Sequence, residues 1–165
     1  MRVLHRIAWI GLTLVGAFMV FAVVSDLRSD HSAGIPNDHT GTFKKLTGQS
    51  FAQLHQSASG VTHYVTRLEV GYALHELTFA LLFLAVVLVP LRQAQRWAWW
   101  ACWAIMVANV GYLVTFGIED STIVARSLIA VIAVPVFLVL AAPFVFSPNK
   151  PAARAKLGVA ATSTN

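Results

Sequence analysis

Charged residues are scarce in this chain. They make up 12% of the 165 residues, while 57% are hydrophobic, and a soluble domain usually carries about 25% charged residues. The single cysteine, Cys102, excludes an intramolecular disulfide and a Cys-x-x-Cys redox or zinc site. The composition therefore indicates a chain whose surface mostly faces lipid.

The sequence also lacks the motifs that would identify an enzyme. Gly-x-Gly-x-x-Gly, Walker and Gly-x-Ser-x-Gly patterns do not occur, so nucleotide binding and serine hydrolysis have no support. The net charge of +5 is not gathered into a basic stripe, so we expect no nucleic-acid partner. The histidines lack a metal-ligand spacing, so we expect no metal and no cofactor.

Four long apolar runs predict an all-α integral membrane protein, because each has about the 20 residues that a helix needs to cross a bilayer. We expect an antiparallel four-helix bundle in one domain, residues 1–146, with helices at about 4–24, 68–91, 97–117 and 123–146. The first run, Ile7–Val24, is too long for the core of a signal peptide, and no clear small-x-small site precedes Ser25. A retained helix is therefore favoured over a cleaved signal.

The charges predict the topology of the bundle. All seven acids fall in segments on one side, whereas the segments on the other side hold only bases: Arg2, Arg6, Arg92, Arg96, Lys150, Arg154 and Lys156. Short basic segments stay in the cytoplasm, so both termini should be cytoplasmic, in a plasma (inner) membrane. The five tryptophans also fall toward the basic side, which fits their preference for the headgroup level.

Two regions outside the apolar runs should differ in structure. The outer loop, residues 25–64, begins with an irregular part rich in Ser, Gly, Pro, Asn and Asp. Its second part, Thr42–Gln56, has apolar residues at helical spacing and predicts a short amphipathic helix on the membrane surface, interrupted at Gly48. The tail, residues 147–165, should be a disordered cytoplasmic segment.

Polar residues inside the apolar runs define a candidate site. Glu69, Tyr72 and Glu76 share one helix face, and Glu76 would lie about 12 Å below Leu68 at 1.5 Å per residue. Ionisable groups at such a depth are costly and usually face the bundle interior. The candidate ligand pocket comprises Glu69, Tyr72, His75, Glu76, Asn109, Tyr112 and Arg126.

Two interpretations of Glu76 stay open. It could lock the helices together through Arg126, His75 or Asn109, or it could anchor a ligand or transfer a proton. His75 follows it too closely to form a dyad, because neighbouring helical residues point about 100° apart. We expect His75 to bond a backbone carbonyl or another helix instead.

Short features of the chain resemble those of known membrane proteins. They are Asp26 at the outer end of the first helix, the long first loop, the run Glu76-Leu77-Thr78-Phe79, and Glu119-Asp120 after the third helix. The layout of residues 4–146 is similar to the DoxX-like group and to the EXPERA group of sterol isomerases and sterol-binding receptors. The second resemblance implies a site for a sterol-like ligand around Glu76.

Two functions from different classes follow. The preferred hypothesis is a non-enzymatic subunit or partner of a membrane complex, in contact with membrane lipids and with a larger membrane protein or a second copy of the chain. The alternative is a lipid- or sterol-binding protein, or an isomerase-type enzyme, with an outward-open polar pocket around Glu76. A pocket lined by the candidate residues would favour the alternative.

Overall fold

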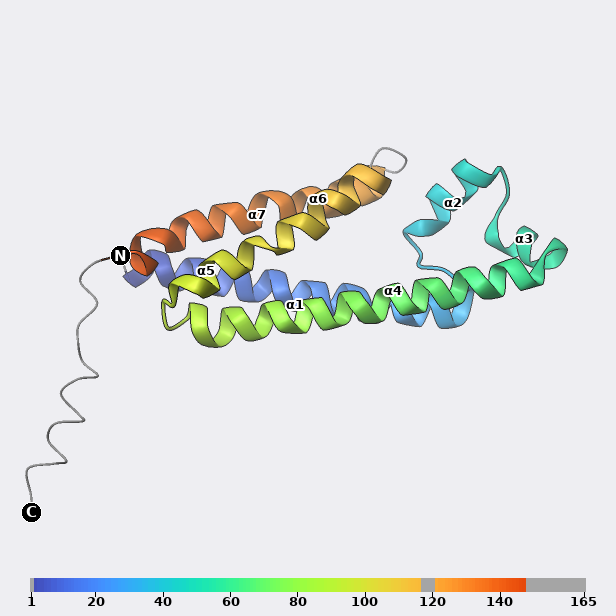
Figure 1. Ribbon diagram of the computed structural model, residues 1–165. Helices are drawn as coiled ribbons and strands as arrows, with labels where there is room; N and C mark the ends of the chain where they lie inside the picture. The colour runs from blue at the N-terminus through green and yellow to red at the C-terminus, as the bar shows by residue number, and fades with distance from the viewer. Residues whose placement is uncertain (1, 117–120, 148–165) are drawn as a thin grey trace, which may run out of the picture.

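The computed structural model describes residues 2–116 and 121–147, and the elements in that part of the chain are helices (Figure 1). They are α1 (Arg2–Ala33), α2 (His39–Thr47), α3 (Phe51–Ser57), α4 (Ser59–Val86), the π-helix η1 (Val87–Leu91), α5 (Arg96–Trp103), α6 (Ile105–Phe116) and α7 (Ser121–Val145). Four stretches are long and apolar enough to cross a membrane: α1, α4 with η1, α5 with α6, and α7. The number of membrane helices is the one predicted.

The helices form an elongated antiparallel bundle in which α1 packs against both α4 and α7, and α6 packs against α7 (Figure 1). We call the end that holds the turn at residues 92–95 the turn end. The opposite end, which carries α2 and α3 in the segment 34–58, is the loop end. The two outer ends of the described chain, Arg2 and Ser147, lie toward the turn end (Figure 1).

The hydrophobic core is concentrated toward the turn end. Its fully buried side chains include Leu12, Val87, Ile105, Leu138 and Val145, which come from α1, η1, α6 and α7. Apolar packing without polar gaps gives the close atomic contacts that stabilise helices in lipid, where no hydrophobic effect separates helix from solvent.

Two tryptophans strengthen the turn end with hydrogen bonds. The indole N–H of Trp99 donates to the carbonyl oxygen of Leu138 over 2.7 Å, and that of Trp9 donates to the carbonyl oxygen of Val87 over 3.0 Å. The guanidinium of Arg92 lies 5.0 Å from the centre of the Trp9 ring, within the range of a cation–π contact. Each bond joins different elements, so they hold α1, η1, α5 and α7 in register.

Two glycines on α1 allow close helix approach. A Cβ on Gly11 would lie 2.4 Å from the Phe137 ring of α7, and one on Gly16 would lie 2.6 Å from the Leu84 side chain of α4. Small residues at such positions let membrane helices pack tightly. The glycines serve two different neighbours, which explains why their spacing does not match the usual four-residue motif.

The first and second predicted membrane helices were too short. The structure extends α1 to Ala33 rather than residue 24, and begins α4 at Ser59 rather than residue 68. At 1.5 Å per residue α1 is about 48 Å long, well beyond the about 30 Å of hydrocarbon core. Both helices therefore project past the bilayer, and the loop shrinks from residues 25–64 to residues 34–58.

The segment 34–58 holds two short helices rather than the single predicted helix over Thr42–Gln56. They separate at Gly48, which has φ +76°, a left-handed conformation that favours glycine. A capping box between Ser50 and Gln53 begins α3, and the rings of Phe43 and Phe51 meet edge to face at 5.3 Å. A position on the membrane surface stays a prediction for both helices.

The third predicted helix, residues 97–117, is two helices that meet at Ala104. The amides of Ala104 and Val107 bond to carbonyls three residues earlier, at 3.1 Å each, which is the tighter spacing of a 3₁₀ turn. Helix α6 ends at Phe116. The turn at Glu119-Asp120 and most of the predicted tail, residues 148–165, lie outside the described residues.

The close approach at Gly11 leads to a test of the packing. We expect Gly11→Ala to destabilise the protein by about 1–3 kcal/mol, because the added methyl group must displace the Phe137 ring. Gly71→Ala is the matched control, since a Cβ there meets nothing within 4 Å. Thermal unfolding in the same detergent measures both variants, and equal melting temperatures would contradict the packing described.

Candidate functional site: a cavity between α4 and α6

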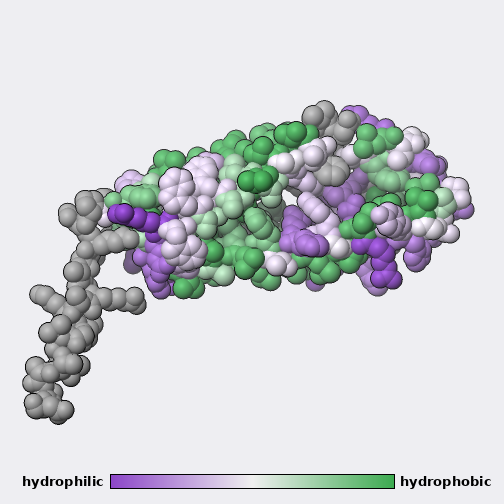
Figure 2. Space-filling view, viewed as in Figure 1, coloured by the Kyte–Doolittle hydropathy of each residue, from purple (hydrophilic) through white to green (hydrophobic). Residues whose placement is uncertain are grey.

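A cavity of about 170 Å³ lies in the loop half of the bundle, between α4 and α6. The two helices pack little against each other there, and α1 and α7 contribute further lining residues. Figure 2 shows hydrophilic side chains beside a hollow on this face. The lining residues are Phe18, Met19, Phe21, Ala22, Ser25, Asp26, Pro36, Asp38, His39, Glu69, Tyr72, Ala73, Glu76, Asn109, Tyr112, Ser127 and Ala130.

Part of the cavity lining is exposed on the side of the bundle. Its lining includes Phe18, Phe21 and Tyr72, whose side chains are 53%, 69% and 47% exposed on the surface of the bundle. At the loop end, by contrast, Pro36, Asp38 and His39 lie against it. The sequence predicts a pocket that opens outward; in the structure loop residues line that end, and the exposed lining residues lie on the side of the bundle.

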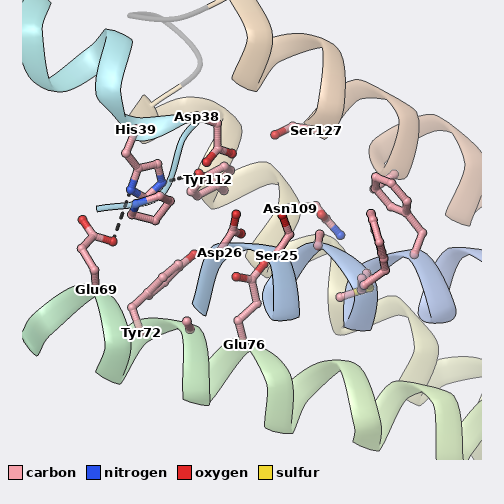
Figure 3. A pocket seen from close by; sticks show the side chains of 17 residues that line it. Ser25, Asp26, Asp38, His39, Glu69, Tyr72, Glu76, Asn109, Tyr112 and Ser127 are labelled. Atoms are coloured by element: carbon pink, nitrogen blue, oxygen red, sulfur yellow. Dashed lines mark hydrogen bonds and ion pairs between the residues drawn. The ribbon is translucent and has the colours of Figure 1, made fainter. Parts of the chain in front are cut away.

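Four carboxylates line this cavity, which is unusual for a site among membrane helices. They are Asp26 of α1, Asp38 just before α2, and Glu69 and Glu76 of α4 (Figure 3). The described lining residues include one histidine and no lysine or arginine. Acceptor oxygens from α1, α4 and the segment before α2 therefore face the cavity, and they can accept hydrogen bonds from a bound group.

His39 joins three elements at the loop end of the cavity. Its Nδ1 lies 3.2 Å from Oε2 of Glu69 on α4, and its Nε2 lies 2.7 Å from the hydroxyl oxygen of Tyr112 on α6 (Figure 3). The side chain is 11% exposed. Since His39 is the first residue of α2, one imidazole links the loop segment to both walls of the cavity.

The surroundings of His39 favour its charged form. Burial lowers the pKa, but the hydrogen bond with Glu69 and the negative charges of Glu69, Asp38 and Asp26 raise it, and the net effect is a pKa above the ordinary value of 6.5. A histidine so placed carries a proton over more of the neutral pH range than an exposed one. Its contact with Glu69 is then an ion pair rather than a neutral hydrogen bond.

Deeper in the cavity, Glu76 points from α4 toward Ser25 and Asp26 of α1 (Figure 3). Asn109 of α6 lines the cavity too, but its side-chain amide donates to the carbonyl of Ile105 in its own helix, over 3.1 Å. Glu76 makes no hydrogen bond or ion pair with any side chain that the structure describes. A carboxyl group directed into such a cavity is available to a ligand.

The structure brings together five of the seven predicted site residues. Glu69, Tyr72, Glu76, Asn109 and Tyr112 line the cavity. His75 does not: it is exposed on α4, and its Nδ1 lies 2.7 Å from the carbonyl oxygen of Gly71, which is the backbone contact expected for it. Arg126 belongs to α7, but its side chain is outside the described part of the structure.

Sequence reasoning missed the contribution of the loop. It assigned the stretch around Asp38 and His39 to an irregular, solvated segment, whereas both residues line the cavity. The partners of His39 are 30 and 73 residues away in the chain, so no local pattern indicates them. The one available signal was the polar run Asn37–Thr40 directly after a proline, which predicts a helix start at a fixed position.

A second hollow, of about 610 Å³, lies beside the projecting parts of α1 and α4 and includes His31, His55 and His63. His55 is engaged with Thr62, whose hydroxyl oxygen lies 2.7 Å from its Nδ1. Within residues 2–116 and 121–147, no group of three or more His, Cys, Asp or Glu side chains has an arrangement that could hold a metal ion.

Comparisons of the chain with protein-family models, with curated proteins and with solved structures find no match. The likeness to the DoxX-like and EXPERA groups therefore stays a similarity of layout. Function has to be argued from the geometry of the cavity.

The geometry of His39 predicts a pH-dependent contribution to stability. Because its pKa is raised above 6.5, the ion pair with Glu69 contributes fully below that pH and is lost as the pH rises through the raised pKa. We expect Glu69→Gln to lower the His39 pKa and to remove about 1 kcal/mol of stability at low pH. NMR of ring-labelled histidine gives the pKa, and thermal unfolding across pH gives the stability. An unchanged pKa in the variant would refute the ion pair.

Proposed function

We propose that this protein binds an amphipathic, lipid- or sterol-like ligand in the cavity between α4 and α6. The observation that carries the proposal is a polar, carboxylate-lined cavity whose lining is partly exposed on the side of the bundle, between helices long and apolar enough to span a membrane. Buried polar groups inside a bilayer are costly and usually serve a ligand or a transport path. A ligand that lives in the membrane would reach this site without leaving the lipid.

The chemistry of the walls suggests what the ligand's head group must offer. Asp26, Glu69 and Glu76 present acceptor oxygens, and Tyr72 and Tyr112 add aromatic faces. A head group with hydrogen-bond donors, either a hydroxyl or an ammonium group, matches these walls. An anionic head group would meet like charges.

The size of the cavity suggests how the ligand would sit. Its volume of about 170 Å³ is below the about 300–1,000 Å³ of pockets that enclose a drug-sized molecule. The cavity would hold the head group and its first carbon atoms. The apolar remainder would pass through the opening, along Phe18 and Phe21 of α1, into the bilayer.

An isomerase-type activity is a second candidate at the same site. Figure 3 shows the carboxyl groups of Glu76 and Asp26 directed toward one another. Two carboxyl groups at one site can divide the roles of proton donor and proton acceptor, as acid–base catalysis requires. In this version Glu76 transfers the proton, and Tyr72, Asn109 and Tyr112 orient the substrate.

The cavity changes the balance between the two functions suggested by the sequence. A purely structural role for Glu76 would place it in a sealed contact with Arg126, Asn109 or His75. Asn109 and His75 bond within their own helices, and the side chain of Arg126 lies outside the described part of the structure. A subunit of a larger complex remains the competing hypothesis. The proposed orientation, supported by the charge distribution, has both termini in the cytoplasm of a plasma (inner) membrane.

Native mass spectrometry tests the proposal directly. Detergent-purified protein is offered single-chain amphiphiles of equal length with an ammonium, a hydroxyl or a sulfate head. We expect the first two to bind and the sulfate not to bind. We also expect Glu76→Gln to weaken ammonium binding about tenfold or more, through loss of one charge-assisted contact.

His75→Gln is the control, because His75 lies on the same helix but outside the cavity lining. It should bind like the wild type. A stoichiometric protein that co-purifies, together with equal binding of all three head groups in every variant, would instead establish the subunit hypothesis.

A further inference from the structure

The loop end of the cavity is closed by a short stretch of chain. Residues 34–38 cross from the end of α1 to the start of α2, and Pro36, Asp38 and His39 line the cavity. The stretch is anchored on α4 beside the cavity by the hydroxyl of Thr66, which donates to the carbonyl oxygen of Gly34 over 2.6 Å. On the cavity side, His39 at the end of this stretch bonds Glu69 of α4 and Tyr112 of α6.

We propose that His39 is a proton-dependent latch that closes the loop end of the cavity and so controls exchange between the cavity and the aqueous phase beyond it. That the latch regulates access of a ligand rests on the proposed function, the binding of an amphipathic ligand in this cavity. The closure itself is a property of the chain and does not require a ligand.

The latch is strongest when the imidazole is charged. Imidazolium carries a proton on each ring nitrogen, so Nδ1–H donates to the Glu69 carboxylate while Nε2–H donates to the Tyr112 oxygen. When the proton on Nε2 is lost, Tyr112 must turn its own O–H toward that nitrogen, and the bond to Glu69 loses its charge assistance. The bridge then holds less firmly, although its geometry is unchanged.

The described groups around His39 come from three helices and from the residue before it. Glu69 and Tyr72 lie on α4, Tyr112 on α6, Asp26 and Asp30 on α1, and Asp38 is the preceding residue. The pKa of His39 is lowered by burial but raised further by Glu69, Asp38 and Asp26, so it stands above 6.5. His39 therefore keeps its proton to a higher pH than an exposed histidine does.

The lateral opening does not depend on this bridge. Phe18, Phe21 and Tyr72 border that opening, and none of them contributes to the bonds of His39. Closing the latch would thus leave exchange with the membrane available while exchange with water slows. Access to the cavity from water would then depend on pH, whereas access from lipid would not. At low pH a molecule could enter from lipid alone, and at higher pH it could enter from lipid or from water.

A cysteine reporter inside the cavity tests this without any ligand. Ala73 lines the cavity and is 3% exposed, so Ala73→Cys places a thiol there, with Cys102→Ala removing the native one. The protein is held in lipid nanodiscs and treated with a permanently charged methanethiosulfonate reagent, which cannot pass through lipid. Rates are divided by those of a free thiol at each pH, to remove the effect of thiol ionisation.

We expect the corrected rate to rise about threefold or more from pH 6 to about 8.5, the size expected when one charge-assisted bond is weakened. His39→Gln and Glu69→Gln should each be fast and independent of pH. His75→Gln is the matched control, a histidine of α4 that does not line the cavity, and should follow the wild type. Only variants that elute as a single species in size-exclusion chromatography are compared. If one of His39→Gln and Glu69→Gln fails this criterion, the other is enough for the test.

Two reagents of opposite charge separate the latch from simple electrostatics. A latch gives the same pH trend with the trimethylammonium and the sulfonate reagent, whereas a change of charge at His39 alone gives opposite trends. A corrected rate that does not change with pH, or opposite trends, overturns the proposal. Either result leaves amphiphile binding untouched, and absence of amphiphile binding leaves the accessibility result in place.

Discussion

Tight packing at the turn end is the constraint on which the rest of the structure depends. The four-residue turn at 92–95 brings α4 and α5 together, and Trp9 and Trp99 then tie that end to α1 and α7 with hydrogen bonds to backbone carbonyls. From there α4 and α6 diverge toward the loop end. The cavity is the space left by this divergence, and the two helices that stay in contact, α1 and α7, contribute further lining residues.

Polar side chains line the cavity that remains where apolar packing ends. Carboxylates at this depth need compensation, and the chain supplies part of it from outside the membrane helices. The segment 34–58 returns over the site and inserts His39 between Glu69 and Tyr112. The loop is thus part of the site, and the projecting ends of α1 and α4 are the platform that brings it there.

The sequence predicts the membrane helices well because lipid imposes a simple rule on length and polarity. It fails at their ends for the same reason. Residues 25–33 are polar enough to read as loop, yet they continue α1 because they project beyond the lipid and pack beside α4. Hydropathy predicts only the part of a helix that lies in lipid. The helix itself continues as long as it has other helices to pack against.

The candidate site was predictable only where it lies on periodic helices. Glu69, Tyr72 and Glu76 share a face by spacing alone, and Asn109 and Tyr112 follow at a matching depth. His39 and Asp38 come from a segment whose position depends on the turn at Pro36 and on contacts distant in sequence. The direction of the opening was equally hidden, because it depends on how far α4 and α6 diverge.

The exposed tryptophans of the turn end, Trp97 and Trp100, would set the height of the site in the membrane. Glu76 lies 15 residues from Leu91, or about 22 Å along the helix, in a hydrocarbon core of about 30 Å. Tryptophans hold their end at one headgroup layer, so any variation in bilayer thickness is taken up on the far side. In a thick membrane the lateral opening faces acyl chains, and in a thin one it approaches the opposite headgroups. The lipid composition of the membrane would therefore decide which part of a passing molecule meets the carboxylates first.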